Sequence, residues 1–286
     1  MRRKQHSCFN RSVSTGSRCV DAGCAPDRYA SSMSPITLAN MKPFLLVSTR
    51  PEEEALDSEY HAYLRASGLD KENLKLAELD LVGLPTIDPS DYSGVFVAGS
   101  PYGASAPDGY VSETQQWVFE ELRGLFSKVL EAKVPVFATG ASMTILAEVL
   151  NAEVTADLAE YAELVDIESV REAEGDPIYE SLPHAFPAYV NHGAGVSKLP
   201  EGATRLARSL NTPVQVFRYG DRTYGVQFNP ELDGKVIERK MEAYEDAGDT
   251  GFGDAESLVQ AGRHSTGEHC GGRMIRNFVN VFAEED

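Results

Sequence analysis

Short apolar segments alternate with amphipathic ones from residue 44 onward, and this alternation constrains the fold more than any other feature of the chain. The runs at 44–48, 94–98 and 134–138 have the length and composition of strands that are buried on both faces. Between them, residues 52–67 and 112–132 carry apolar side chains at helical spacing. Strands that alternate with helices predict an α/β fold, a doubly wound and mostly parallel sheet with helices on both faces.

The later part of the chain has a different pattern. Residues 153–228 contain several short β-rich runs that are separated by proline and glycine turns. Helical patterns return at residues 234–247 and at 274–282. The sequence shows no internal repeat and no clear linker, so we expect a single α/β domain over residues 41–286.

The first 40 residues differ from the rest in charge and composition. They carry six cationic and two acidic side chains, are rich in serine, and hold three of the four cysteines. They lack the apolar core that a secretory signal needs. We interpret residues 1–40 as a disordered extension or a misassigned start, with the domain beginning at Met41. A transit peptide and a thiol metal site are the alternatives.

The overall composition argues against several classes of function. The chain has 286 residues, of which 42% are hydrophobic, and a formal net charge of −18. This charge argues against nucleic-acid binding, which needs clustered Lys and Arg, and no apolar run is long enough to cross a bilayer. Beyond residue 40 the only cysteine is Cys270, which excludes a disulfide framework within the domain and predicts a reducing, cytoplasmic location.

Two segments carry the strongest functional pattern. Residues 134–150 read VPVFATGASMTILAEVL, a buried strand that passes through Gly140 into a helix. Residues 224–231 read YGVQFNPE, a second strand that ends in a carboxylate. Sites in parallel sheets form at the carboxyl ends of the strands, so we expect these two ends to converge with the turn at Gly99.

Together the two segments resemble the active-site segments of the class I glutamine amidotransferases, which read approximately PVFGICFGHQLLAEAL and GVQFHPE. The resemblance implies a flavodoxin-like domain, similar to the stand-alone members that are related to the amidotransferase part of GMP synthase. Gly140 falls on the nucleophilic cysteine of the family and Asn229 on the histidine base. Glu231 falls on the acid that orients the histidine, so only this member of the triad is retained.

The two replacements remove the groups on which the family's reaction depends. In the family, a thiolate attacks the side-chain amide of glutamine while histidine takes and returns the proton. Gly140 has no side chain, and the carboxamide of Asn229 cannot accept a proton near neutral pH. Glycine also adopts a strained turn without steric cost. We therefore expect a pseudoenzyme without glutamine hydrolysis.

Other matches imply further pocket residues. The turn at 97–101 resembles the family turn that supplies an oxyanion N–H, and the segment 191–193 resembles one near the glutamine pocket, with His192 at the rim. His192 and Glu231 also have ordinary roles open to them, a satisfied histidine and a carboxylate that caps a turn or faces solvent. The pocket residues implied by the resemblance are Gly99, Ser100, Ala141, His192 and Gln227.

Three functional hypotheses stay open. The first is a pseudoenzyme that binds a protein partner, such as a synthetase subunit, or a small amino-acid-like ligand. The second is an active or altered amidotransferase or hydrolase with Ser142 or Cys270 as a substitute nucleophile. The third is an accessory subunit that docks on a synthetase without feeding it ammonia. No motif implies a cofactor, and HSTGEHC at 264–270 has an irregular spacing for zinc.

Overall fold

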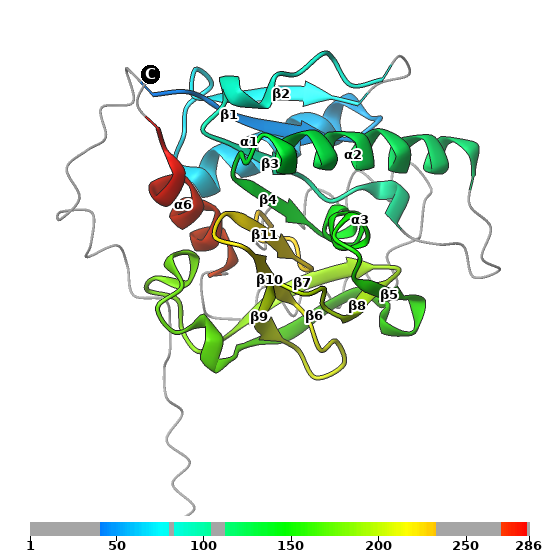
Figure 1. The fold of residues 1–286 in the computed structure, drawn as a ribbon, viewed down its shortest axis with the longest axis vertical. Helices are drawn as coiled ribbons and strands as arrows, with labels where there is room; N and C mark the ends of the chain where they lie inside the picture. The colour runs from blue at the N-terminus through cyan, green and yellow to red at the C-terminus, as the bar shows by residue number, and fades with distance from the viewer. Residues whose placement is uncertain (1–40, 80–82, 104–111, 233–269, 285–286) are drawn as a thin grey trace, which may run out of the picture.

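The fold is built on a mixed sheet of nine strands, shown in Figure 1 as a computed structural model that describes residues 41–79, 83–103, 112–232 and 270–284. One half of the sheet is parallel and the other half antiparallel. The parallel strands are β2 (Leu74–Glu78), β1 (Phe44–Ser48), β3 (Gly94–Val97), β4 (Val136–Thr139) and β11 (Thr223–Val226), in spatial order. The antiparallel strands continue the order as β10 (Val216–Tyr219), β9 (Ala203–Arg208), β6 (Glu160–Ser169) and β7 (Ala185–His192).

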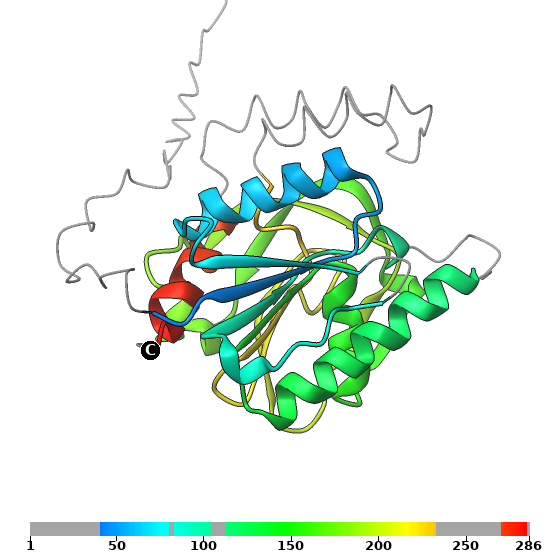
Figure 2. The same ribbon diagram turned by 90° about the horizontal axis from the view of Figure 1, so that it is seen from above.

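Helices cover both faces of the parallel half. They are α1 (Glu53–Ser67), α2 (Glu113–Glu131), α3 (Ala141–Val149) and α6 (Gly271–Phe282). Figures 1 and 2 show α1 and α6 on one face and α2 and α3 on the other. A separate two-stranded sheet pairs β5 (Glu153–Thr155) with β8 (Gly195–Lys198) beside α3.

Alternate residues of the central strands feed two hydrophobic clusters, one on each face of the sheet. On the side of α1 and α6, Phe96 packs on Phe44, Phe137 and Phe278 with ring centroids 5.2–5.9 Å apart. On the other side, the strand residues between these aromatic rings pack against α2 and α3. Side chains of a strand point to opposite faces in turn, so burial on both sides explains the unbroken apolar runs in the sequence.

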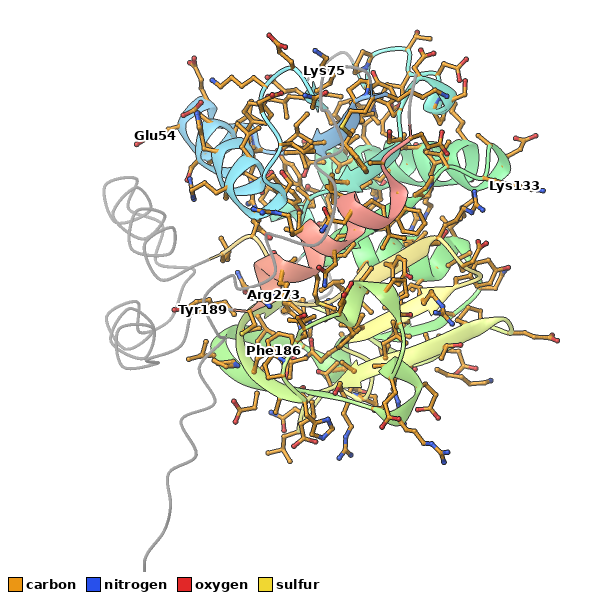
Figure 3. All side chains as sticks on the ribbon, turned by 90° about the vertical axis from the view of Figure 1, so that its left-hand side faces the viewer. Glu54, Lys75, Lys133, Phe186, Tyr189 and Arg273 are labelled. Carbon is orange, nitrogen blue, oxygen red and sulfur yellow. The ribbon has the colours of Figure 1, made fainter. Side chains whose placement is uncertain are left out.

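Local sequence explains where the two long helices begin and end. The side chain of Ser112 accepts a hydrogen bond from the backbone N of Gln115 at 3.1 Å and so caps α2. The helix α1 ends at Gly68, whose φ of 75° favours glycine. The outer surface is charged, and Figure 3 shows exposed side chains such as Glu54 and Lys75 pointing away from the sheet.

The predicted flavodoxin-like α/β architecture is confirmed. The first strand has the predicted bounds. The helices predicted at 52–67 and 112–132 are shorter by one and two residues, and the last helix begins at Gly271, three residues before the predicted helical pattern. The sequence did not predict β5 and β8, and the antiparallel half makes the sheet wider than a purely parallel one. The predicted extension at 1–40 and the predicted helix at 234–247 lie outside the described residues. Within the described ranges, no helix combines the length and apolar character that crossing a membrane requires.

Candidate functional site

The strands β4 and β11 bring two of the predicted site segments together. They pair in parallel with Val226 opposite Thr139, so both chains leave the sheet at the same edge. Just beyond this pair, the backbone N of Gly140 donates a hydrogen bond to the carbonyl O of Val226 at 2.9 Å. The turn that enters α3 is therefore fixed against the end of β11.

Gly140 forms a sharp turn between β4 and α3. Its φ is 54° and its ψ is −128°, a backbone conformation that residues other than glycine rarely adopt. The first residue of α3 is Ala141, which is 6% exposed. The chain thus has the strained strand-to-helix turn that was predicted, with a residue that occupies it without steric cost.

The carboxamide of Asn229 lies between two glycines. A β-carbon built on Gly99 would lie 2.9 Å from Oδ1 of Asn229, and one built on Gly140 would lie 3.3 Å from the same atom. Real β-carbons essentially never come closer than 3.0 Å to another heavy atom, so Asn229 occupies space that a side chain at Gly99 would need. The predicted convergence of the turn at Gly99, the turn at Gly140 and the end of the second strand is present in the structure.

Neither of the proposed substitute nucleophiles faces this space as a free group. Ser142 is fully buried, and its Oγ donates a hydrogen bond to the carbonyl O of Ala98 at 2.6 Å. Cys270 is 6% exposed and takes part in a disulfide, contrary to the expectation of a free thiol in a reducing environment. Both groups therefore have structural roles that hold them away from nucleophilic chemistry.

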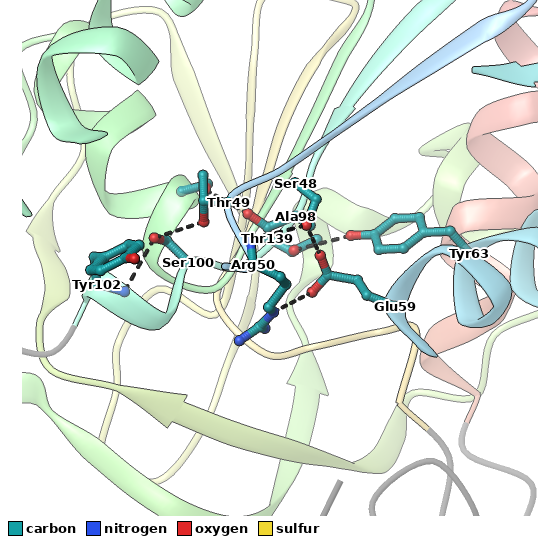
Figure 4. Close-up of polar contacts among 10 residues, drawn as sticks. Ser48, Thr49, Arg50, Glu59, Tyr63, Ala98, Ser100, Tyr102 and Thr139 are labelled. Atoms are coloured by element: carbon teal, nitrogen blue, oxygen red, sulfur yellow. Dashed lines mark hydrogen bonds and ion pairs between the residues drawn. The ribbon is translucent and has the colours of Figure 1, made fainter. Parts of the chain in front are cut away.

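A buried carboxylate holds the loop after β1, at the same edge of the sheet (Figure 4). Glu59 of α1 is fully buried, with Oε2 accepting from Oγ of Ser48 at 2.5 Å and Oε1 accepting from Nε of Arg50 at 2.9 Å. Removing a charged group from water costs several kcal/mol, about 5 or more when the group has no partner, so a buried carboxylate needs such contacts. Sequence reasoning missed Glu59, although an acidic residue on the apolar stripe of a helix is a usable signal.

Ser100 links the loop after β1 to the turn after β3. Its Oγ accepts hydrogen bonds from Oγ1 of Thr49 at 2.9 Å and from the backbone N of Tyr102 at 3.2 Å. Figure 4 shows these contacts next to those of Ser48 and Glu59. Ser100 is half-buried, so this predicted pocket residue lies at the edge of the site and fastens two loops together.

Tyr63 supports the strand-to-helix turn at Gly140, which we call the elbow. Its hydroxyl lies 3.1 Å from Oγ1 of Thr139, the residue before Gly140, and its side chain is fully buried. Burial, and after it the charge of Glu231, raises the pKa of Tyr63 well above its usual value, so the phenol stays protonated. Glu231 is only 4% exposed, which rules out the solvent-facing role that the sequence left open.

A second buried network connects the elbow to the antiparallel strands. Nε2 of Gln227 donates to the carbonyl O of Gly140 at 3.4 Å, and its backbone N donates to the carbonyl O of Gln215 at 2.8 Å. Nε2 of Gln215 donates to Oε2 of Glu160 at 2.7 Å, and the same oxygen lies 2.9 Å from Nε2 of His192. Gln227 is fully buried, and its hydrogen bond to Gly140 supports the elbow.

The position of His192 corrects the expectation of a residue at an open rim. The residue is 2% exposed, because it ends β7 and turns toward the interior of the antiparallel strands. Its Nδ1 lies 3.0 Å from the carbonyl O of Ala194, which can only accept, so this nitrogen carries a hydrogen. Burial raises the pKa of Glu160, but the hydrogen bond and charge of His192, together with further hydrogen bonds such as that of Gln215, outweigh it and lower this pKa below the usual value.

The described residues offer no metal site. Among residues 41–79, 83–103, 112–232 and 270–284, no group of three or more His, Cys, Asp or Glu side chains could hold an ion. Residues 264–269, which precede Cys270 in the irregular HSTGEHC segment, lie outside these ranges.

Comparison with known proteins places this chain in a family. The family model described as glutamine amidotransferase class-I matches residues 62–244. A glutamine-hydrolysing GMP synthase of Thermomicrobium roseum is 30% identical over 183 residues, which are 62% of this chain and 31% of the relative. A second one, of Thermosipho melanesiensis, is 43% identical over 65 residues, 22% of this chain and 13% of the relative. The matched part of this chain thus spans less than a third of these curated relatives.

Solved structures share the fold. A glutamine amidotransferase of Thermotoga maritima superposes with a TM-score of 0.64 at 22% identity, covering 84% of this chain and 98% of the other. A Thermoplasma acidophilum protein assigned to GMP synthase as one of its subunits has a TM-score of 0.55 at 18% identity, covering 84% and 94% of the two chains. At this identity the likeness establishes the architecture alone.

Proposed function

Because the chain belongs to the class I glutamine amidotransferase family, we propose that it is a GMP synthase-like member that has lost glutamine hydrolysis and acts by binding. One observation carries this proposal. The chain has a strained strand-to-helix turn at Gly140 with the carboxamide of Asn229 beside it, and the resemblance to the family assigns these two positions to the nucleophile and the base. On this assignment the frame of the site is kept and the reacting groups are absent.

Two independent features of the site support the proposed absence of glutamine hydrolysis. Covalent attack needs an activated nucleophile within reach of the amide carbon, and Gly140 supplies no atom for this step. Proton transfer needs a group that titrates near the working pH, and the carboxamide of Asn229 does not. Ser142 lacks an adjacent base, since its Oγ is bonded to a backbone carbonyl.

The ligand that we propose for the site is a small amino-acid-like molecule that carries an amide or carboxylate. The helix α3 begins directly after Gly140 with no acidic side chain in its first turn, so its amide groups present a partial positive charge. Asn229 adds a carboxamide that can donate and accept beside them. Such a set of donors suits a carbonyl or carboxylate oxygen.

Titration calorimetry with L-glutamine and L-glutamate tests this ligand. We expect saturable binding of one of them to the wild-type protein. We expect loss of binding in Gly99→Val, because the added side chain must displace Asn229. Gly124→Ala is the control, because Gly124 lies on α2 with nothing within 4 Å of an added β-carbon. Equal binding by wild type and Gly99→Val would remove the site from the proposal.

A protein partner is the second component of the proposal. The similarity to GMP synthases, together with the fold shared with a Thermoplasma acidophilum protein assigned to GMP synthase as one of its subunits, supports a synthetase subunit as this partner. Size-exclusion chromatography of this protein mixed with a GMP synthetase subunit of the same organism tests it. We expect a complex that elutes earlier than either component, and separate elution at micromolar concentrations would contradict the partnership.

A further inference from the structure

Leu210 is the most exposed large apolar residue in the described part of the chain. It is 97% exposed, and Val281, at 41%, is the other exposed one in the described ranges. Single exposed apolar residues are common on protein surfaces, so exposure alone assigns no role to Leu210. A role follows only if the fold presents this side chain in a defined way and at a defined place.

The turn that carries Leu210 is held in place by buried polar groups. The backbone N of Ser209 donates to the carbonyl O of Thr212 at 2.9 Å, and the backbone N of Thr212 donates to Oγ of Ser209 at 3.1 Å. Oγ of Ser209 also donates to Oε1 of Glu160 at 3.2 Å and accepts from Nε2 of Gln215 at 3.1 Å. All four of these residues are buried. Leu210 therefore projects from an ordered turn, so little conformational entropy is lost when a partner contacts it.

This turn lies at the same edge of the sheet as the elbow. Val226 at the end of β11 pairs with Thr139 on one side and with Val216, the first residue of β10, on the other. The turn of Leu210 joins β9 to the start of β10, so it leaves the sheet at the edge where β4 and β11 end, which we call the elbow edge. Figure 1 shows β4, β11, β10 and β9 in this order.

The elbow and Leu210 are close enough for one partner to contact both. Three strand spacings of about 4.8 Å separate β4 from β9, so the two turns lie about 14 Å apart along the elbow edge. A protein interface of standard size covers about 800 Å² of each partner, which is a disc of about 16 Å radius. A partner that is centred on the elbow would therefore reach Leu210.

Acidic side chains are exposed along the elbow edge on both sides of the elbow. Glu53 and Glu54 begin α1 directly after the loop that follows β1, and Asp157 lies just before the start of β6, near the turn of Leu210. The whole chain has a net charge of −18. A second copy of this chain would bring the same acidic edge and would be repelled, whereas a partner surface rich in Lys and Arg would be attracted.

We propose that Leu210 is the apolar anchor of a protein interface on the elbow edge, where it inserts into an apolar pocket that lysine and arginine side chains surround on the partner. The partner is the synthetase subunit of the proposed function, so this inference rests on that proposal. The ordered turn fixes the position of the leucine, and the acidic side chains set the charge that the partner must carry.

Calorimetric titration of the full chain into a GMP synthetase subunit of the same organism tests the anchor. We expect Leu210→Ala to weaken binding about tenfold, because it removes most of the apolar surface that the pocket would bury. Leu210→Met keeps a side chain of similar volume and should bind within about twofold of wild type. Val281→Ala is the matched control and should leave the affinity unchanged, since α6 ends at the opposite edge, where the backbone N of Lys42 donates to the carbonyl O of Glu284.

The association rate tests the charge of the partner. Removing two acidic charges from the elbow edge, in Glu53→Gln with Asp157→Asn, should slow association about threefold at low ionic strength, and added salt should reduce the difference. Glu72→Gln with Glu131→Gln removes two exposed charges from the opposite edge, where β2 and β4 begin, and should have a smaller effect. Equal effects of the two double variants would contradict a basic partner surface on the elbow edge.

Folding does not confound the test, because Leu210 is almost fully exposed and its variants should keep the wild-type urea midpoint. A wild-type complex that Leu210→Ala forms equally tightly would overturn the anchor and leave the proposed partnership intact. No complex with wild type at micromolar concentrations would overturn both. A dimer of this chain in sedimentation velocity that Leu210→Ala weakens would overturn the inference in favour of a second copy.

Discussion

Oδ1 of Asn229 lies 3.3 Å from the point that a β-carbon on Gly140 would occupy. The two residues are 89 positions apart in the chain, and they meet because β4 and β11 are parallel neighbours that end together. The backbone therefore presents two side-chain positions to each other, the ones that we propose for the nucleophile and the base. Neither position holds a group that can react, which is the physical basis of the proposed loss of hydrolysis.

Gly99→Ala should destabilise the protein through Asn229. A β-carbon at Gly99 would lie 2.9 Å from Oδ1 of Asn229, so the variant must displace the carboxamide, at a cost of about 1–3 kcal/mol. In an Asn229→Ala background the same change should cost less than about 0.5 kcal/mol. Urea denaturation of the four proteins in this cycle gives both values. Equal costs in the two backgrounds would show that Asn229 does not occupy this space.

Gly140→Ala should also be destabilising, because of the backbone conformation. At φ 54° and ψ −128°, an L side chain is strained by on the order of 1–3 kcal/mol. Gly175→Ala is the matched control, since Gly175 has a φ of 82° but nothing within 4 Å of an added β-carbon, and it should cost about 1 kcal/mol.

Gly124→Ala provides the opposite sign. Gly124 lies on the exposed side of α2 with open space around it, and alanine should stabilise the helix by about 0.5–1 kcal/mol. Among Gly124→Ala, Gly175→Ala and Gly140→Ala, the urea midpoint should therefore be above that of wild type for Gly124→Ala and lowest for Gly140→Ala. A Gly140→Ala protein as stable as wild type would contradict the strained turn.

Glu160→Gln should cost about 3 kcal/mol, because it leaves His192 buried without its charged partner. The side chains of this pair are only 1% and 2% exposed. Glu168→Gln on the same strand is the control, since its partner Arg208 and the carboxylate itself are about half exposed, and it should cost about 0–1 kcal/mol. If urea denaturation gives similar losses in the free energy of unfolding for the two variants, the buried pair contributes no more to stability than the exposed one.

The pH dependence of stability follows from the same carboxylate. The pKa of Glu160 in the folded protein lies below its ordinary value of 4.5, so folding favours the ionised form. Its stabilising contribution is complete above pH 4.5 and is lost as the pH falls through the lower, folded-state pKa. Between pH 5 and 3, we therefore expect the wild-type urea midpoint to fall more steeply than that of Glu160→Gln. Parallel curves would contradict this assignment.

Ser142→Ala should separate a structural serine from a substitute nucleophile. The variant loses one buried hydrogen bond to Ala98 and should be destabilised by about 1 kcal/mol. Any ammonia that the wild type releases from glutamine should be unchanged, because this hydroxyl has no base. A variant that folds but loses a measurable wild-type rate would instead support the altered enzyme.

The sequence predicts the parallel half of the fold well, because burial on both faces leaves unbroken apolar runs. The first strand, 44–48, has its predicted bounds for this reason. The strands β5 and β8 were missed because they are short and partly exposed, so no periodicity marks them. The elbow was predicted from the motif at Gly140, since a glycine between an apolar strand and a helix indicates a turn whatever its function.

The parts of the site that depend on distant partners were not predicted. His192 was expected at the rim of the glutamine pocket, but the position of its side chain depends on Glu160 and Gln215, which are 32 and 23 residues away in the sequence. Ser142 offered a hydroxyl near the turn, and only the structure shows that this group is bonded to Ala98. Spacing indicates which strand end a residue follows, but the direction of its side chain is set by tertiary packing.

Ammonia release from L-glutamine by the purified wild-type protein tests the central claim most directly. The account predicts a rate no higher than that of a protein-free blank, with some activity gained in the double variant Gly140→Cys with Asn229→His, because the two positions already face each other. Release by the wild type at rates typical of the family would contradict the account, whatever the double variant does.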